Sequence, residues 1–340
     1  MEQPQSSTRL VLCGKSVVEN ELARCLKTNN TLKLPDGSPV TAVLQSEIEN
    51  QETVGDDDFF RANSYMNLLS TSLFGKLLIY SPKLASTHDV ISNIILLSCL
   101  LVLSVLLMCS SKAEMEDGRI VPLLQYVVCL AVTEAIKDVC RQNGMPSLDV
   151  RIKWPNDLYL DGLKVGGILC TSTFKSKKFN VSAGIGLNVN NPQPTLCLNA
   201  VLRRLGCVAS RLRREYILAA FFNKFECLYD IFISQGFQAL EELYYKTWLH
   251  RKMSTLERIN GTIFRGATAS HLQLACSGQR VIIQEKSESQ GHVSENVVTI
   301  QGLTSSGYLL AVTKDGQTCE LHPDGNSFDF FKGLVRRKLT

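Results

Sequence analysis

The sequence contains neither the paired cysteines nor the grouped histidines that structural zinc sites in proteins usually require. Its 340 residues include 12 cysteines and 5 histidines, but both are scattered and no Cys-x-x-Cys pair occurs. This pattern argues against a zinc site and against a disulfide framework. Reduced thiols in a cytosolic-type compartment are the simpler interpretation. We therefore expect no metal ion bound by a cluster of protein side chains.

A strong excess of one charge is also absent. The formal net charge is +4, which is too small to indicate nucleic-acid binding. Acidic residues outnumber basic ones over the first 75 positions, which argues against an N-terminal DNA-binding domain. Residues 1–20 include Glu2 and Glu19 and lack an Arg/Ser-rich amphipathic pattern, so neither a transit peptide nor a signal peptide is predicted. The expected location is the cytoplasm.

A complete phosphate-binding loop is missing near the start of the chain. Gly14-Lys15-Ser16 follows a predicted strand at Arg9–Cys13, but the first glycine of that motif would fall at Arg9. We therefore do not expect nucleotide binding at this position.

The most informative feature that is present is a polar motif followed by a glycine pair. Lys153-Trp154-Pro155-Asn156-Asp157 precedes an apolar stretch, an Asp161-Gly162 turn and then Lys164-Val165-Gly166-Gly167-Ile168-Leu169. Asp-Gly is a strong hairpin-turn signal, and glycines inside a strand allow close approach to the backbone. Two lysines beside an Asn-Asp pair and a bare backbone suit an anionic ligand that carries a metal ion.

The motif and its spacing closely resemble the catalytic core of the biotin–protein ligases, or holocarboxylase synthetases, especially those of plants. Three further segments extend the resemblance: Ser86-Thr87-His88, Gly184–Asn190 and about Leu303–Lys338. The resemblance implies an α+β or α/β fold with a mixed-sheet catalytic domain of the class II synthetase-like, biotin ligase type. Flanking helices would cover the sheet, and a small SH3-like β-barrel would follow.

The expected domains follow from this comparison and from the composition. Apolar residues make up 45% of the chain, enough for a sizeable core. We predict an acidic N-terminal region at 1–73, a catalytic domain at 74–250, an inserted linker at 251–278 and a barrel at 279–340. The main predicted elements are a strand at Lys76–Tyr80, a helix from Pro122 to Cys140, a strand at Phe179–Val189, helices at Arg211–Phe232 and Gly236–Trp248, and short strands after residue 279.

The resemblance also implies a two-step reaction. The biotin carboxylate would attack the α-phosphate of ATP to give biotinyl-5′-AMP, and a lysine of an acceptor protein would then take the biotinyl group. Acceptors in the family are the biotin domains of carboxylases such as acetyl-CoA carboxylase. Biotin and ATP are therefore the expected small molecules, and Mg²⁺ is expected to arrive with ATP. Nothing in the sequence fixes the oligomeric state.

Site residues can be carried over only where the motifs match. Lys164 and Lys153 are the predicted catalytic residues. The predicted biotin-binding residues are Ser86, Thr87, His88, Lys164, Gly166 and Gly167; the predicted nucleotide-binding residues are Lys153, Asn156, Asp157 and Asn188. Simpler interpretations stay open: a solvated hairpin lysine, a polar turn, a helix cap at Ser86 and Thr87, or a strand bulge at the glycine pair. His88 stands where the family usually has asparagine.

One segment does not fit the family. The adenylate-binding loop Gln-x-x-Gly-Arg-Gly-Arg is absent, and an apolar segment at about 94–114 stands in its place, including the uncharged run Ile94–Cys109. Codons for Leu106–Glu114 exist that, in another frame, spell Val-Ala-Asp-Val-Gln-Phe-Lys-Gly-Arg. We therefore hypothesise that about 93–114 is a splice or frame variant, which the transcript sequence would decide.

The apolar run has several possible consequences. As a helix it would span about 24 Å, against a hydrocarbon core of about 30 Å, so a membrane span and a buried helix are both open. Within the ligase fold it would replace core strands, and we expect the sheet to lose pairing partners. The resulting hypotheses are an impaired ligase, a non-catalytic form that binds acceptor or nucleotide, and a membrane-tethered form.

Overall fold

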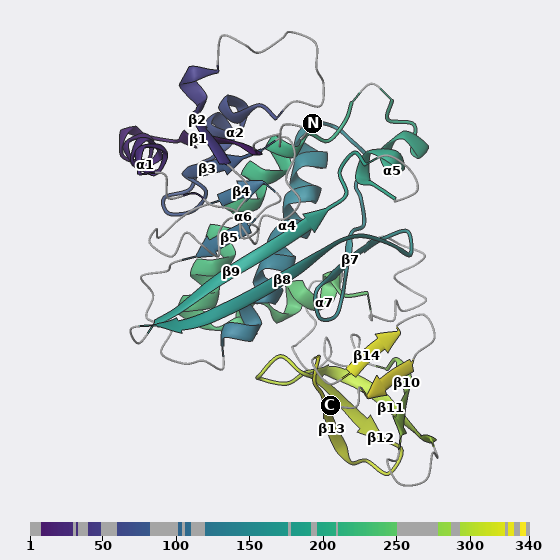
Figure 1. Ribbon diagram of the computed structural model, residues 1–340. Coiled ribbons are helices and arrows are strands. Elements are labelled where there is room, and N and C mark those ends of the chain that lie inside the picture. The colour runs from purple at the N-terminus through teal and green to yellow at the C-terminus, as the bar shows by residue number, and fades with distance from the viewer. Residues whose placement is uncertain are drawn as a thin grey trace, which may run out of the picture.

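The computed structural model describes residues 8–29, 32, 40–48, 60–81, 101–103, 106–109, 120–175, 178–191, 196–208, 210–249, 278–286, 293–323, 326–329 and 334–337. Two sheets organise these residues, one of nine strands and one of six. Figure 1 shows the larger sheet with its helices above the smaller C-terminal one. The predicted linker at 251–278 lies outside the described residues except for Gly278.

The larger sheet is mixed and has the strand order β2-β1-β3-β4-β5-β9-β8-β7-β6. Its strands are β1 (Thr8–Gly14), β2 (Val40–Leu44), β3 (Leu77–Tyr80), β4 (Leu101–Leu103), β5 (Leu106–Cys109), β6 (Arg151–Lys153), β7 (Asp157–Leu160), β8 (Leu163–Lys175) and β9 (Lys178–Leu187). The β1–β2 and β3–β4 pairs are parallel and the other pairs are antiparallel. The first two strands, which fall in the predicted N-terminal region, therefore belong to the same sheet as the predicted catalytic domain.

Helices cover the sheet on both faces. Those in the described residues are α1 (Val17–Thr28), α2 (Ala62–Leu68), α4 (Val121–Gln142), α5 (Leu198–Arg204), α6 (Arg214–Gln235) and α7 (Glu241–Thr247), with short 3₁₀ turns η1 (Gln45–Glu47) and η3 (Phe237–Leu240). Alternation along β1 separates the two layers. Leu10 and Leu12 pack with α1, whereas Val11 and Cys13 belong to the main core with α2, α4 and α6.

Helix α4 forms the centre of the main core. Pro122 lies in its first turn, as the sequence predicted, where a missing N–H is tolerated. Most of its side chains are buried, and it contacts α6, α7, β8 and β9. The predicted helix at Gly236–Trp248 is instead divided into η3 and α7, because Gly236 ends α6 at φ +78° and the chain restarts in a tighter turn.

The apolar segment does not form the expected helix where the structure describes it. Leu101–Leu103 and Leu106–Cys109 are strands: β4 pairs with β3, and β5 pairs with β9. The expected loss of pairing partners is therefore wrong, because these two strands fill the gap and use the backbone groups of β3 and β9. Among the described residues, no helix is both long and apolar enough to cross a bilayer.

The C-terminal sheet has the order β13-β12-β11-β10-β15-β14. Its strands are β10 (Arg280–Lys286), β11 (Val293–Leu303), β12 (Leu309–Thr313), β13 (Thr318–Leu321), β14 (Asn326–Asp329) and β15 (Leu334–Arg337). This arrangement confirms the predicted small β-domain. Val281, Ile300 and Leu309 belong to the same continuous core as α4, so the small domain packs against the large one.

The place of β5 in the sheet generates a stability prediction. Because β5 lies between β4 and β9, replacing Leu107 with proline removes a backbone donor from the middle of the sheet. We expect Leu107→Pro to lower the free energy of unfolding by roughly 1–3 kcal/mol, and Leu107→Val, which keeps the N–H, to leave it nearly unchanged. Urea unfolding measures both. Equal stability of the two variants would contradict the pairing of β5.

Candidate active site

Three consecutive strands, β6, β7 and β8, and the two turns between them position the polar motif. β6 ends at Lys153, the chain turns through Trp154, Pro155 and Asn156, and β7 begins at Asp157. The Trp154–Pro155 peptide bond is cis. Asp161 and Gly162 then turn the chain into β8 with φ values of +51° and +76°, as an Asp-Gly hairpin turn requires. The motif is thereby brought back over the start of β8.

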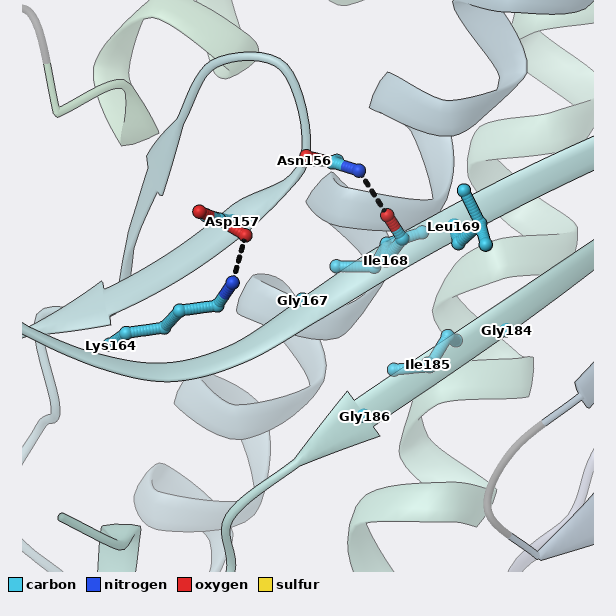
Figure 2. A pocket seen from close by; sticks show the side chains of 9 residues that line it. All are labelled: Asn156, Asp157, Lys164, Gly167, Ile168, Leu169, Gly184, Ile185 and Gly186. Atoms are coloured by element: carbon cyan, nitrogen blue, oxygen red, sulfur yellow. Dashed lines mark hydrogen bonds and ion pairs between the residues drawn. The ribbon is translucent and has the colours of Figure 1, made fainter. Parts of the chain in front are cut away.

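The pairing of β8 with β9 creates a surface without side chains. Gly167 lies opposite Gly186, and Leu169 lies opposite Gly184. Since residues two apart share a face of a strand, these four positions lie on one face, and three of them have no side chain. A hollow of about 340 Å³ opens above them, shown in Figure 2. Its lining residues are Asn156, Asp157, Lys164, Gly167, Ile168, Leu169, Gly184, Ile185 and Gly186.

An ion pair spans one side of the hollow. The Lys164 Nζ lies 2.5 Å from Asp157 Oδ1, and the Lys153 Nζ lies 3.9 Å from Asp157 Oδ2. The Lys164 side chain is 54% exposed, whereas those of Asp157 and Lys153 are 23% and 16% exposed. Asp157 therefore orients a lysine that stays open to a ligand, and Figure 2 shows this amine directed at the Asp157 carboxylate. Lys153 also lies 5.7 Å from the centre of the Tyr159 ring.

Asn156, on the other side of the hollow, holds the turn against β8 by hydrogen bonds. Its side-chain amide donates to the Ile168 carbonyl at 2.6 Å, and the Ile168 N–H donates to the Asn156 carbonyl at 2.8 Å. This reciprocal pair fixes the turn to β8. The predicted contact of Asn156 with nucleotide stays a prediction, and its side-chain oxygen is the group that would make it.

The two glycines of the motif differ in their surroundings. A Cβ on Gly166 would lie 2.6 Å from the Gly186 carbonyl oxygen, so this glycine allows two strands to approach closely. A Cβ on Gly167 would lie 3.3 Å from Asp157 Oδ1 and 3.7 Å from Lys164 Nζ. Gly167 therefore belongs to the hollow, whereas Gly166 belongs to the strand packing behind it.

The remaining predicted residues are not gathered at the hollow. Asn188 follows β9, where its N–H donates to Val165 at 2.8 Å and its carbonyl accepts from Leu198 at 2.9 Å. It is not among the residues that line the hollow. Ser86, Thr87 and His88 lie outside the described residues. The ligand roles assigned to these four residues stay predictions.

Five lining residues received no role from the sequence: Ile168, Leu169, Gly184, Ile185 and Gly186. The signal that could have found them was glycine repeated inside two neighbouring strands. Gly184-Ile185-Gly186 faces Gly167-Ile168-Leu169 in register, and such glycines weaken a strand unless something must approach its backbone.

Among the described residues, neither a thiolate nor a protein-only metal site accompanies the lysine. Burial raises the pKa of the Cys170 thiol, next to Leu169 on β8, to about 12, so this thiol stays protonated at neutral pH. In the described ranges, no group of three or more His, Cys, Asp or Glu side chains could hold a metal ion. The arrangement suits charge stabilisation by positioned lysines and not covalent catalysis.

Comparisons with known proteins identify the family of this chain. Residues 96–188 match the Biotin/lipoate A/B protein ligase family, and residues 277–333 match the Biotin protein ligase C terminal domain. "Biotin--protein ligase 1, chloroplastic" of Arabidopsis thaliana is 54% identical over 99% of this chain and 89% of that protein. "Biotin--protein ligase 2" of the same plant is 55% identical over 98% of this chain and 99% of that protein.

A more distant relative shares the central part of the chain. "Biotin--protein ligase" of Homo sapiens is 30% identical over 68% of this chain and 28% of that protein. The predicted enzyme class and the predicted mixed-sheet fold with a small C-terminal domain are confirmed.

The predicted cytoplasmic location is wrong on this comparison, because one highly similar relative is named chloroplastic. The N-terminal composition that suggested the cytoplasm was therefore not a sound guide to location. The chain matches both family domains, and it is more than 50% identical to two plant relatives over nearly its whole length. These findings show that this chain belongs to the biotin protein ligase family.

Proposed function

We propose that this chain carries the machinery to activate biotin with ATP and to transfer it to a lysine of an acceptor protein. In the first step a biotin carboxylate oxygen bonds to the α-phosphorus of ATP, and pyrophosphate leaves. In the second step an acceptor lysine amine attacks the acyl carbon, loses a proton, and AMP leaves. No step needs a covalent enzyme intermediate, which agrees with the protonated thiol of Cys170 next to Leu169.

The observation that carries this proposal is the Lys164 amine held beside a floor of glycines. Asp157 fixes that amine at 2.5 Å, and the floor leaves the backbone open to a planar, extended ligand. In the proposed complex Lys164 lies beside the biotin carboxylate and stabilises the negative charge that builds up on the acyl phosphate. Leu169, which is 61% exposed, supplies an apolar wall for the biotin tail.

The nucleotide is assigned to the motif side of the hollow. Asn156 and Asp157 line the hollow there, Lys153 pairs with Asp157, and Asn188 follows β9. Ser86, Thr87 and His88 are assigned to the biotin ring from the resemblance alone. Mg²⁺ is assigned to the ATP phosphates, because the Asp157 carboxylate is already paired with Lys164 and the described residues contain no metal cluster.

The acceptor is a biotin domain of a carboxylase, such as that of acetyl-CoA carboxylase. Its lysine must reach the acyl carbon from the open side of the hollow. This assignment rests on the chemistry of the family, in which the enzyme serves carboxylases that need covalently bound biotin.

We further propose that this chain turns over poorly. The family's adenylate loop contributes glycines that wrap the ligand and arginines that bind its phosphate. The apolar segment restores strand pairing through β4 and β5 but contains no arginine. Without a cover, biotinyl-5′-AMP is exposed to water and dissociates before transfer. A non-catalytic form that keeps ligand binding is the alternative that the same substitution favours.

Restoring the loop tests both proposals. Purified chain is incubated with an apo acceptor domain, biotin and Mg-ATP, and biotinylation is followed on a streptavidin blot. A second protein carries Val-Ala-Asp-Val-Gln-Phe-Lys-Gly-Arg in place of residues 106–114. We expect strong labelling only by the restored protein, and weaker labelling when its final arginine is alanine. Equal labelling by the natural and restored chains would contradict the role of the loop, and no labelling by either would contradict ligase function.

Lys164→Ala in the restored protein should slow biotinyl-5′-AMP formation by roughly 10²–10³-fold, since a preorganised charge is lost. Lys246→Ala is the matched control, because this exposed lysine on α7 only pairs with Glu242 at 2.5 Å. Pyrophosphate release measures both variants. A similar small effect of the two substitutions would exclude Lys164 from the reaction.

The two kinds of glycine should respond differently to an added methyl group. Gly186→Ala meets only the Gly167 carbonyl, at 3.9 Å, so stability should be kept while biotin affinity falls roughly tenfold or more. Gly166→Ala meets the Gly186 carbonyl at 2.6 Å, so the free energy of unfolding should fall by roughly 1–3 kcal/mol. Calorimetric biotin titration and urea unfolding separate the two effects. Unchanged biotin affinity in Gly186→Ala would place the ligand elsewhere.

A further inference from the structure

Three residues far apart in the sequence meet at the boundary between the two domains. The Tyr126 hydroxyl on α4 donates to the Gly307 carbonyl at 2.5 Å. The Trp154 indole N–H donates to the Tyr126 hydroxyl oxygen at 2.9 Å and to the same carbonyl at 3.3 Å. We call these three residues the Gly307 junction. It joins the turn between β11 and β12 to the loop that carries the polar motif.

Only glycine fits at the centre of this junction. Gly307 has φ +83°, and a Cβ there would lie 2.8 Å from a ring carbon of Tyr126 and 2.9 Å from a methyl of Leu123. The turn around it is itself closed, because the Gly307 N–H donates to the Thr304 carbonyl at 2.9 Å. The carbonyl that receives both hydrogen bonds is therefore presented by a rigid turn pressed against α4.

A second contact holds the same strand end. The Leu303 N–H donates to the Tyr245 hydroxyl at 2.9 Å, and a Cβ on Gly302 would lie 3.0 Å from that hydroxyl. Two tyrosine hydroxyls, one from α4 and one from α7, thus bind the backbone of the small domain on either side of residue 304. Three hydrogen bonds between these side chains and backbone atoms of one turn fix its orientation as well as its distance.

The junction acts on the site through Trp154. Trp154 is 3% exposed and its indole ends at Gly307. Asn156 and Asp157, which follow it in the chain, line the hollow, and Lys153, which precedes it, pairs with Asp157. The backbone between them cannot shift unless the indole leaves the junction. The position of the Asp157 carboxylate therefore depends on contact with the C-terminal domain. The position of the Lys164 amine, which pairs with Asp157, depends on it as well.

We propose that the C-terminal domain is a positioning element for the Lys153–Asp157 loop, and that Tyr126, Trp154 and Gly307 are the positioning residues that couple the two. The inference that this coupling supports catalysis rests on the proposed function of the loop; the coupling itself does not. None of the three residues needs to touch a substrate.

Amide hydrogen exchange on the full chain tests the coupling without any ligand. Gly307→Ala should speed exchange in the segment 153–168, including the Ile168 amide that donates to Asn156, by about tenfold. Gly316→Ala is the matched control: Gly316 has φ +80°, in the next turn of the same domain, and a Cβ there meets nothing within 4 Å. Both variants carry the same kind of backbone strain. If the two substitutions changed the exchange rate of segment 153–168 equally, the proposal would be overturned.

Tyr126→Phe tests the junction with less risk to folding, since it keeps the ring in the core and removes only the hydroxyl. We expect faster exchange in the same segment, by about threefold to tenfold. Combining it with Gly307→Ala should add little, because both changes break one shared contact. Additive effects, or an exchange increase spread evenly over the chain, would show general destabilisation and contradict a specific junction.

The catalytic consequence is measured in the loop-restored protein. Gly307→Ala should lower kcat/KM for ATP about tenfold through misplacement of the loop, and Gly316→Ala should leave it nearly unchanged. Altered exchange with unchanged kcat/KM would overturn the positioning role. Absence of adenylate formation in the restored parent protein would instead contradict the proposed function, and the exchange comparison would still decide the coupling.

Discussion

The close approach of β8 to β9 is the constraint on which the rest of the site depends. Gly166 lets the two strands come together at the Gly186 carbonyl, and this brings Gly167, Gly184 and Gly186 onto one open face. A side chain at any of these three positions would fill the floor of the hollow. The amine of Lys164 can meet a ligand only because that floor has no side chains, since a charged group can act on a ligand only where the ligand can reach it.

The polar loop is held by contacts on three sides. Asn156 ties it to β8, Asp157 ties it to Lys164, and Trp154 ties it to the small domain. The first two contacts reach different residues of β8, Ile168 and Lys164, and the third reaches the small domain, so each restrains a different part of the loop. A site that works by positioning and charge, without a covalent intermediate, depends on such restraint because small displacements reduce the rate steeply.

Local features of the fold were predictable from the sequence. The Asp161-Gly162 turn and the start of α4 at Pro122 follow from backbone preferences, and the lysine spacing identified the family. Contacts between distant residues were not predictable. No local pattern around Tyr126 or Gly307 indicates that these residues, 181 positions apart, are in contact. From the sequence, Gly307 could be any turn glycine; its close contact with the Tyr126 ring is evident only in the structure. The division of labour between Gly166 and Gly167 likewise depends on a strand that follows them in the chain.

The apolar segment separates what a fold requires from what a reaction requires. Its hydrophobicity favoured a helix, but β3 and β9 leave backbone donors and acceptors between them that only strands can use, and β4 and β5 supply them. Backbone pairing accepts almost any side chain, so an unrelated apolar sequence can complete the sheet. Phosphate recognition is not tolerant in this way, because it needs the guanidinium groups of particular arginines at particular positions. A sheet that closes is therefore no evidence that an adenylate loop works.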